Sequence, residues 1–140
     1  MIPILYLSLI ELILKSLCHL NVINKLNINN ETYEEFLKDK IGLDATIFQL
    51  TQVGELCTKL TDEFKSNHNA IDFRGIIGLR NVMVHGYGSL HYDDIFDIVK
   101  VDVPLLINKY LEIVKEEYNV NSVDEYINNY YITRSFNFED

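Results

Sequence analysis

The segment 79–88, LRNVMVHGYG, places an arginine, a histidine and a tyrosine within eight positions, at Arg80, His85 and Tyr87. Arginine is always charged and can hold a phosphate through two parallel hydrogen bonds. Histidine, with an ordinary pKa of about 6.5, can take up or release a proton near neutral pH. The cluster could therefore belong to a catalytic strand-cutting site, to a ligand pocket, or to the ordinary end of a core helix.

On a straight helix, successive residues turn by about 100°. Arg80, Val84 and Tyr87 then lie along one face, while Asn81 and His85 share the adjacent face. Arg80 and His85 are about 140° apart, too divergent to meet on one substrate atom unless the helix end distorts. Two copies of the helix, facing each other across a two-fold axis, would line one cleft with both pairs. The geometry therefore favours a homodimeric site.

Composition limits the class of protein that can carry this cluster. The chain has 140 residues, 48% of them hydrophobic, and only two prolines, which indicates one globular domain. Its net charge of -9 argues against broad electrostatic binding to nucleic acid, which needs a basic face. Any contact with nucleic acid must be local.

The cysteines and the N-terminus suggest a protein of the cytoplasm with no membrane segment. Cys18 and Cys57 are isolated in the sequence, so we expect two buried free thiols in a reducing compartment and no zinc site. The apolar opening of the chain lacks a basic leader and a small-residue cleavage site, and Glu11 and Lys15 interrupt it before it could span a bilayer. We expect a first core or interface helix there.

The hydrophobic pattern is helical almost throughout and shows no strand alternation, which predicts an all-α bundle of four to five main helices. Residues 2–20 are apolar on every side, so this helix should be buried on more than one face, inside the bundle or against a second copy. Thr32 and Glu35 have the spacing of a capping box that opens a short helix. An apolar stripe over 43–64 predicts one long helix.

The second half of the chain continues the helical pattern. A fourth helix should begin near Asp72 and end at the glycines 86 and 88, and a fifth should carry the apolar stripe from Ile95 to Ile113, bent or divided at Pro104. We expect a single domain over 1–118. Residues 119–140 should form an extension with one short helix, opened by Ser122 and Glu125, and then a frayed end.

The RNVMVH segment fits the R-x4-H signature of the HEPN superfamily, and HGY extends it to the form found in HepT-like toxins. The resemblance covers roughly residues 31–112, including YEEFLKDK, the acidic DEF, Gly78 ahead of the motif and VDVPLL. Phe48 departs from it, because members of the family often carry an arginine near that position. The resemblance implies a HEPN-type antiparallel helical bundle that forms a homodimer.

The resemblance further implies a ribonuclease toxin whose antitoxin is a minimal nucleotidyltransferase. Arg80 and His85 would be the catalytic pair, Asn81 the supporting polar residue, and Tyr87 the residue that the antitoxin adenylylates. Such an enzyme needs neither metal nor cofactor, because the 2′-hydroxyl of RNA is itself the nucleophile. The alternative is a HEPN-type binding module without nuclease activity, which serves as the partner or nucleotide-binding subunit of a nucleotidyltransferase.

Structural explanations also exist for the candidate residues. His85 could bond to its own helical turn, Arg80 could pair with one of the 21 acidic residues, and Tyr87 could be a plain surface residue. Asp93 and Asp94 beside His91 are the one group that resembles a metal site, but they suit the N-terminus of a helix better. We expect His19 and His68 to be structural or solvent-exposed.

Overall fold

The computed structural model describes residues 4–116 and 123–129, and it describes the side chains in these ranges except those of residues 4–8 and of Tyr87. The regular elements among the described residues are all helical and include no strand, so the all-α class is confirmed. Within these ranges, no helix combines the length and the apolar character that a membrane crossing requires.

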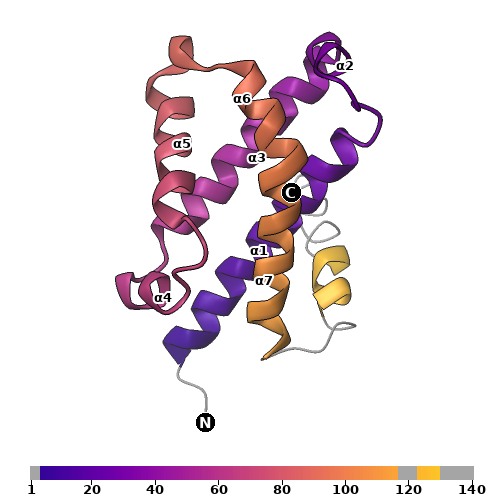
Figure 1. The fold of residues 1–140 in the computed structure, drawn as a ribbon. Helices are drawn as coiled ribbons and strands as arrows, with labels where there is room; N and C mark the ends of the chain where they lie inside the picture. Colours follow the sequence, from indigo (N-terminus) through magenta and orange to yellow (C-terminus); the bar gives the residue numbers. More distant parts are fainter. Residues whose placement is uncertain (1–3, 117–122, 130–140) are drawn as a thin grey trace, which may run out of the picture.

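Helix α1 (Ile4–Leu26) is the central element of the bundle, and it packs against α3 (Lys40–Thr58) and α7 (Val103–Lys115) (Figure 1). Between residues 9 and 20 most side chains are buried, namely Leu9, Ile10, Ile13, Leu14, Ser16, Leu17, Cys18, His19 and Leu20. The predicted burial on more than one face is therefore confirmed, and the chain itself provides the cover. The helix also continues six residues beyond the predicted end at residue 20, to Leu26.

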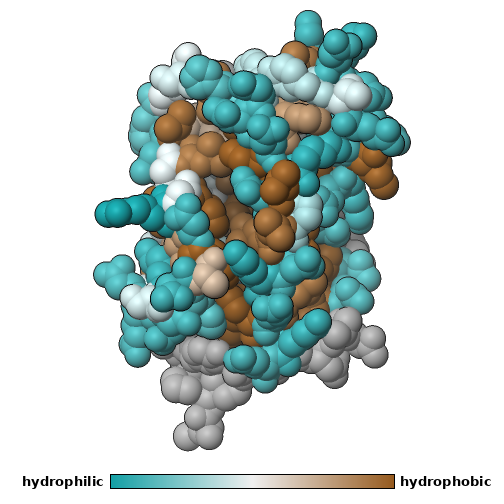
Figure 2. Space-filling view, viewed as in Figure 1, coloured by the Kyte–Doolittle hydropathy of each residue, from teal (hydrophilic) through white to brown (hydrophobic). Residues whose placement is uncertain are grey.

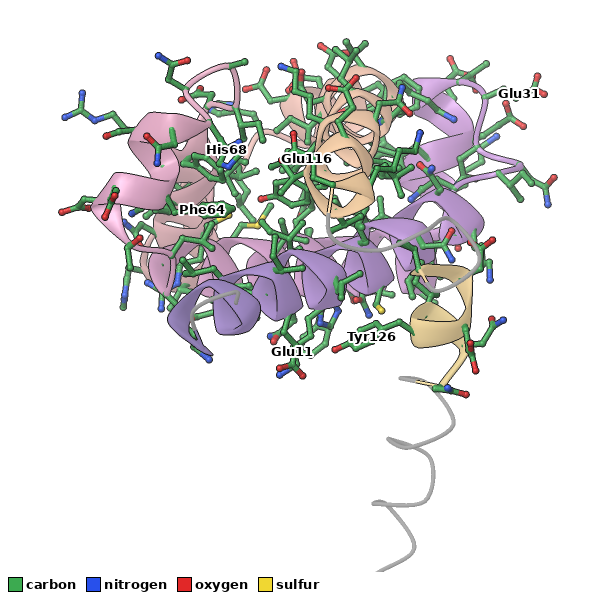
Figure 3. All side chains as sticks on the ribbon, turned by 90° about the horizontal axis from the view of Figure 1, so that it is seen from below. Glu11, Glu31, Phe64, His68, Glu116 and Tyr126 are labelled. Carbon is green, nitrogen blue, oxygen red and sulfur yellow. The ribbon has the colours of Figure 1, made fainter. Side chains whose placement is uncertain are left out.

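A short helical segment beyond the main bundle adds to this cover. Residues 123–129 are helical, Val123 is buried, and Tyr126 and Ile127 pack against the core. Figure 3 shows this segment beside α1, with Tyr126 extending along it. The predicted short helix of the extension is thus present, whereas its predicted cap, Ser122, lies outside the described residues.

The predicted capping box opens helix α2 (Tyr33–Lys38). The backbone N–H of Glu35 donates to Thr32 Oγ1 at 3.2 Å, and the backbone N–H of Thr32 donates to Glu35 Oε1 at 3.1 Å. These two bonds satisfy donors that the first turn of a helix would otherwise leave without partners. Asp39 then caps α3 by accepting the backbone N–H of Gly42.

The prediction of one helix over 43–64 is wrong, because α3 ends at Thr58 and a separate helix, α4 (Asp62–Asn67), follows. Thr61 has an extended backbone, and its side chain accepts the N–H of Phe64 at 3.1 Å, so it caps a new helix. Leu60 and Phe64 remain buried across the break. The apolar stripe over 43–64 therefore indicates a continuous buried face and not a continuous helix.

Helix α5 (Phe73–His85) begins and ends where the sequence predicts. Asp72 caps it through the N–H of Gly75, and Gly86 is its last capping residue. Gly86 has φ -121°, which any residue can adopt, so its missing side chain is not what ends the helix. A 3-10 turn, η1 (Tyr87–Ser89), redirects the chain there, with the N–H of Ser89 donating to Gly86 O at 2.7 Å.

The predicted fifth helix is present, but it is not divided at Pro104, because the backbone stays helical from Tyr92 to Lys115. It consists of α6 (Tyr92–Asp97), a π-helical turn η2 (Ile98–Asp102) and α7, with Pro104 in the first turn of α7. Proline has no N–H to donate at this position, and the π turn lies directly before it, where the N–H of Val103 donates to Ile98 O. The wider π turn keeps the apolar residues on one face, since Ile95, Val99 and Val103 are all buried.

Candidate functional site

The predicted site lies where α5 crosses α3 at close range. Gly54 of α3 is buried, and a Cβ atom placed on it would lie 2.3 Å from Arg80 Cβ and 3.4 Å from the backbone oxygen of Ile76. One turn away, Thr51 Oγ1 donates to Met83 Sδ at 3.5 Å. These contacts show that the two helices run antiparallel and that their backbones approach closely at Gly54.

Arg80 is held by two side chains at this crossing. Its Nε donates to Glu55 Oε1 at 2.8 Å, and its Nη2 donates to the same oxygen. Its Nη1 donates to Asn81 Oδ1 at 2.8 Å. The Arg80 side chain is 22% exposed and that of Glu55 is 38% exposed, so the ion pair lies at the surface but is partly shielded from water.

Asn81 thus contacts Arg80, and its supporting role in catalysis stays a prediction. Ion pairing of Arg80, which the sequence left open as a purely structural explanation, is also present, with Glu55 as the partner. The two observations are compatible, because a guanidinium group has five N–H donors and can serve several acceptors at once.

His85 is exposed at the last position of α5. Among the described residues no hydrogen bond or ion pair joins its ring to Arg80, Asn81 or its own helical turn. The helix stays regular to its end, where the N–H of Gly86 donates to Val82 O at 2.8 Å. No distortion therefore brings His85 toward Arg80 within one chain, and the predicted divergence of about 140° remains.

Tyr87 begins the 3-10 turn that follows α5, so its backbone has left the helix as predicted. Its side chain is not among those that the structure describes. The role of Tyr87 as a modified residue stays a prediction.

The group at His91, Asp93 and Asp94 has the geometry of a helix start. His91 occupies the capping position of α6 without a side-chain capping bond, and both aspartates lie exposed in the first turn, where carboxylates favour the helix dipole. In the described parts of the chain, no three or more His, Cys, Asp or Glu side chains gather closely enough to hold a metal ion.

The other histidines have structural contacts. His19 is buried, and its Nδ1 lies 2.6 Å from Gln49 Oε1. His68 packs its ring on Phe64, with ring centroids 4.5 Å apart (Figure 3).

Both cysteines are buried and neither forms a disulfide, as expected. Cys57 Sγ lies 3.4 Å from Tyr110 Oη, and the two form one buried polar contact. Burial raises the pKa of the Cys57 thiol and raises the pKa of Tyr110 well above its ordinary value. Both groups therefore stay protonated and inert at neutral pH, which excludes Cys57 as a nucleophile.

An apolar cavity of about 320 Å³ opens between α5 and α7, and its lining contains none of the predicted site residues. It is lined mostly by aliphatic side chains, including Leu50, Val53 and Leu106. Figure 2 shows apolar surface in the middle of this face. The cavity is a feature of helix packing beside the site. Its charged lining residues are Asp72, Asp102 and Lys109; of these, Asp72 caps α5 and Lys109 Nζ donates to the backbone oxygen of Ala70.

Sequence reasoning missed Glu55 and Gly54. A usable signal existed for Gly54, since it follows Val53 on the buried side of α3 and a buried helical glycine marks a close approach.

Two exposed apolar side chains lie near the ion pair. Phe48, two turns before Glu55 on the same side of α3, is 54% exposed, and Val84, one turn after Arg80, is 44% exposed. Apolar side chains therefore lie on the same helix faces as the ion pair.

Known proteins resemble this chain over most of its length. The family described as "Ribonuclease HepT-like" matches residues 7–120. A "Putative RNase" of Methanocaldococcus jannaschii is 35% identical over 88 residues, which are 63% of this chain and 73% of the relative. A "Putative RNase" of Caldanaerobacter subterraneus is 28% identical over 86 residues, which are 61% of this chain and 77% of the relative.

A third relative, a "Probable ribonuclease HepT" of Thermococcus cleftensis, is 30% identical over 83 residues, which are 59% of this chain and 76% of the relative. No solved structure matches the chain.

Proposed function

Because the chain belongs to the HepT-like ribonuclease family, we propose that it is a metal-independent endoribonuclease and the toxin of a two-gene toxin-antitoxin pair. The observation that carries this proposal is the Arg80, Asn81 and His85 set at the end of α5, with Arg80 oriented by hydrogen bonds and the His85 ring exposed. The names of the relatives support RNA as the substrate.

In the proposed reaction, His85 takes the proton from a 2′-hydroxyl of RNA, and that oxygen attacks the adjacent phosphorus. The bond from phosphorus to the 5′-oxygen breaks, which leaves a 2′,3′-cyclic phosphate and a 5′-hydroxyl end. The leaving oxygen takes its proton from water or from a protonated His85 of the second protomer. Arg80 donates to the phosphorane oxygens, whose negative charge increases in the transition state.

We further propose that the enzyme is a homodimer. The reason is the divergence of Arg80 and His85 on a regular helix, which pairing of two α5 helices would overcome. The apolar character of α1 does not support a dimer, because the chain itself buries that helix. The exposed Phe48 and Val84 lie on the faces that such a dimer would cover.

The antitoxin in this proposal is a minimal nucleotidyltransferase that adenylylates Tyr87. The support is positional: Tyr87 follows His85 by two residues, and its backbone lies in the turn that leaves α5. An adenylyl group there would bring negative charge and bulk to the opening of a cleft that must receive an RNA phosphate.

Two features favour the second candidate function, a nuclease-inactive binding module that serves a nucleotidyltransferase. The charge of Arg80 is already paired with Glu55, in a chain whose net charge is -9. Both features weaken the attraction for RNA. The two candidates predict opposite results in a cleavage assay.

The decisive experiment is cleavage of RNA in the presence of a chelator by wild type and by His85→Ala. We expect the wild type to cut and the variant to be inactive, with equal thermal stability of both proteins. His68→Ala is a matched control, because His68 is a partly exposed histidine at the C-terminal cap of α4 that contacts only Phe64 among the described aromatic pairs. Equal cleavage by wild type and His85→Ala would exclude the proposed mechanism, and no cleavage by either would favour the binding module.

A further inference from the structure

We infer that Glu55 is a positioning residue of the active site, which fixes the guanidinium plane of Arg80 for the substrate phosphate; this inference rests on the proposed ribonuclease function. Glu55 lies on α3, 25 residues before Arg80 in the chain, and its Oε1 accepts hydrogen bonds from both Nε and Nη2 of Arg80. A contact of this kind constrains the rotation of the whole guanidinium group, because Nε and Nη2 lie on one edge of its plane.

The donors that remain on Arg80 are the ones a phosphate needs. A guanidinium group has five N–H bonds. The described bonds use the Nε–H, one N–H of Nη2 to Glu55 and one N–H of Nη1 to Asn81. One N–H on each terminal nitrogen therefore stays available, so Glu55 can remain bound while a phosphate oxygen is held.

The packing of α3 against α5 holds Arg80 and Glu55 together before any ligand binds. Gly54 lets the Arg80 stem lie directly on α3, which places Glu55, the next residue, within reach of the guanidinium group. The Arg80 side chain is only 22% exposed, so its conformation is restricted before any ligand arrives. Catalytic groups act best when neighbouring residues hold them in the productive geometry in this way.

The competing interpretation is that Glu55 neutralises Arg80 and opposes phosphate binding. The pair is partly exposed, so water and salt screen the charge of Glu55, whereas the geometric restraint on Arg80 is not screened. The two interpretations differ in the sign of the effect: loss of a positioning residue lowers the rate of cleavage, and loss of a competing charge raises it.

The test compares single-turnover RNA cleavage by wild type, Glu55→Gln, Glu55→Ala and the control Glu112→Gln, an exposed glutamate of α7. We expect the cleavage rate to fall roughly 10-fold in Glu55→Gln, which keeps an acceptor oxygen, and roughly 100-fold in Glu55→Ala. Binding of a non-cleavable 2′-deoxy analogue, measured by fluorescence anisotropy, should change less than about 3-fold in Glu55→Gln, because the positive charge remains. An unchanged or faster rate in both Glu55 variants would overturn the inference.

A second measurement does not depend on activity. In an NMR spectrum of the nitrogen-labelled protein, the Arg80 Nε–H resonance, assigned with Arg80→Lys, should be protected from exchange in wild type and in Glu112→Gln. We expect it to broaden or shift in Glu55→Ala. An Arg80 resonance that Glu55→Ala leaves unchanged would refute the positioning role even if no RNA is cut, whereas a lost resonance together with an inactive wild type would refute only the ribonuclease proposal.

Discussion

Replacement of Gly54 by alanine tests the contact on which the site depends. The new Cβ would lie 2.3 Å from Arg80 Cβ and 2.9 Å from Arg80 Cγ. Both atoms belong to the base of the side chain, so a change of rotamer cannot remove the clash with Cβ. Helices α3 and α5 would have to separate by roughly an ångström before ordinary van der Waals contact is restored.

The size of the effect follows from two opposing contributions. Alanine in a helix interior is favoured over glycine by about 1 kcal/mol. Overpacking of a close contact typically costs about 1–3 kcal/mol, and a helix displacement lies toward the upper end. We therefore expect a net loss of about 1–2 kcal/mol, which for a domain of this size lowers the melting temperature by about 3–8 °C. The displacement of Arg80 should also slow RNA cleavage, on the order of 10- to 100-fold.

Gly78 provides a matched control on the facing helix. It is exposed on α5, and a Cβ placed on it would meet nothing within 4 Å. Gly78→Ala should therefore raise the melting temperature by about 2–4 °C through helix propensity alone. Thermal melts followed by circular dichroism compare the two variants. If Gly54→Ala melted at or above the wild-type temperature, the close crossing of α3 and α5 would be refuted.

Three further predictions concern the motif and the core. Arg80→Lys keeps the charge but loses the planar fork, so cleavage should fall at least about 10-fold with unchanged melting temperature; equal activity would mean that Arg80 acts through charge alone. Tyr87→Phe should keep most of the nuclease activity and resist the antitoxin, and mass spectrometry of co-expressed wild type should find adenylate on the peptide with Tyr87; an unmodified peptide would contradict this. Because burial raises the pKa of Cys57 above its ordinary 9.0, the folded state should lose stability above pH 9, by up to about 1.4 kcal/mol per pH unit. Urea unfolding at pH 8 and 10 should show a smaller loss for Cys57→Ser, and an equal loss would contradict the assignment.

Local signals in the sequence were sufficient for the helix class and for most helix ends. The capping box at Thr32 and Glu35 and the start at Asp72 depend on residues within one turn of each other. The break between α3 and α4 was missed for the opposite reason. The apolar spacing continues through it, and only the cap at Thr61 reveals it.

The site was predictable as a set of residue types but not as a geometry. Arg80 and Asn81 are neighbours in the chain, and the structure joins them. Glu55 could not be identified, because the acidic partner of an arginine depends on the register of two helices, and 21 acidic residues were available. That register is set by tertiary packing at Gly54, which one sequence does not specify.

The helical segment 123–129 lies beyond the family match, which ends at residue 120, and it covers part of α1. This restricts how two copies of the chain could assemble. A surface occupied by a chain's own extension is removed from the choices open to a symmetric partner. The surface that carries Phe48, Val84 and the Arg80 ion pair has no such cover in the described chain. In the proposed dimer, the segment 123–129 would thus block pairing through the part of α1 that it covers. That leaves the surface around α5 open and favours the assembly in which the two α5 helices meet.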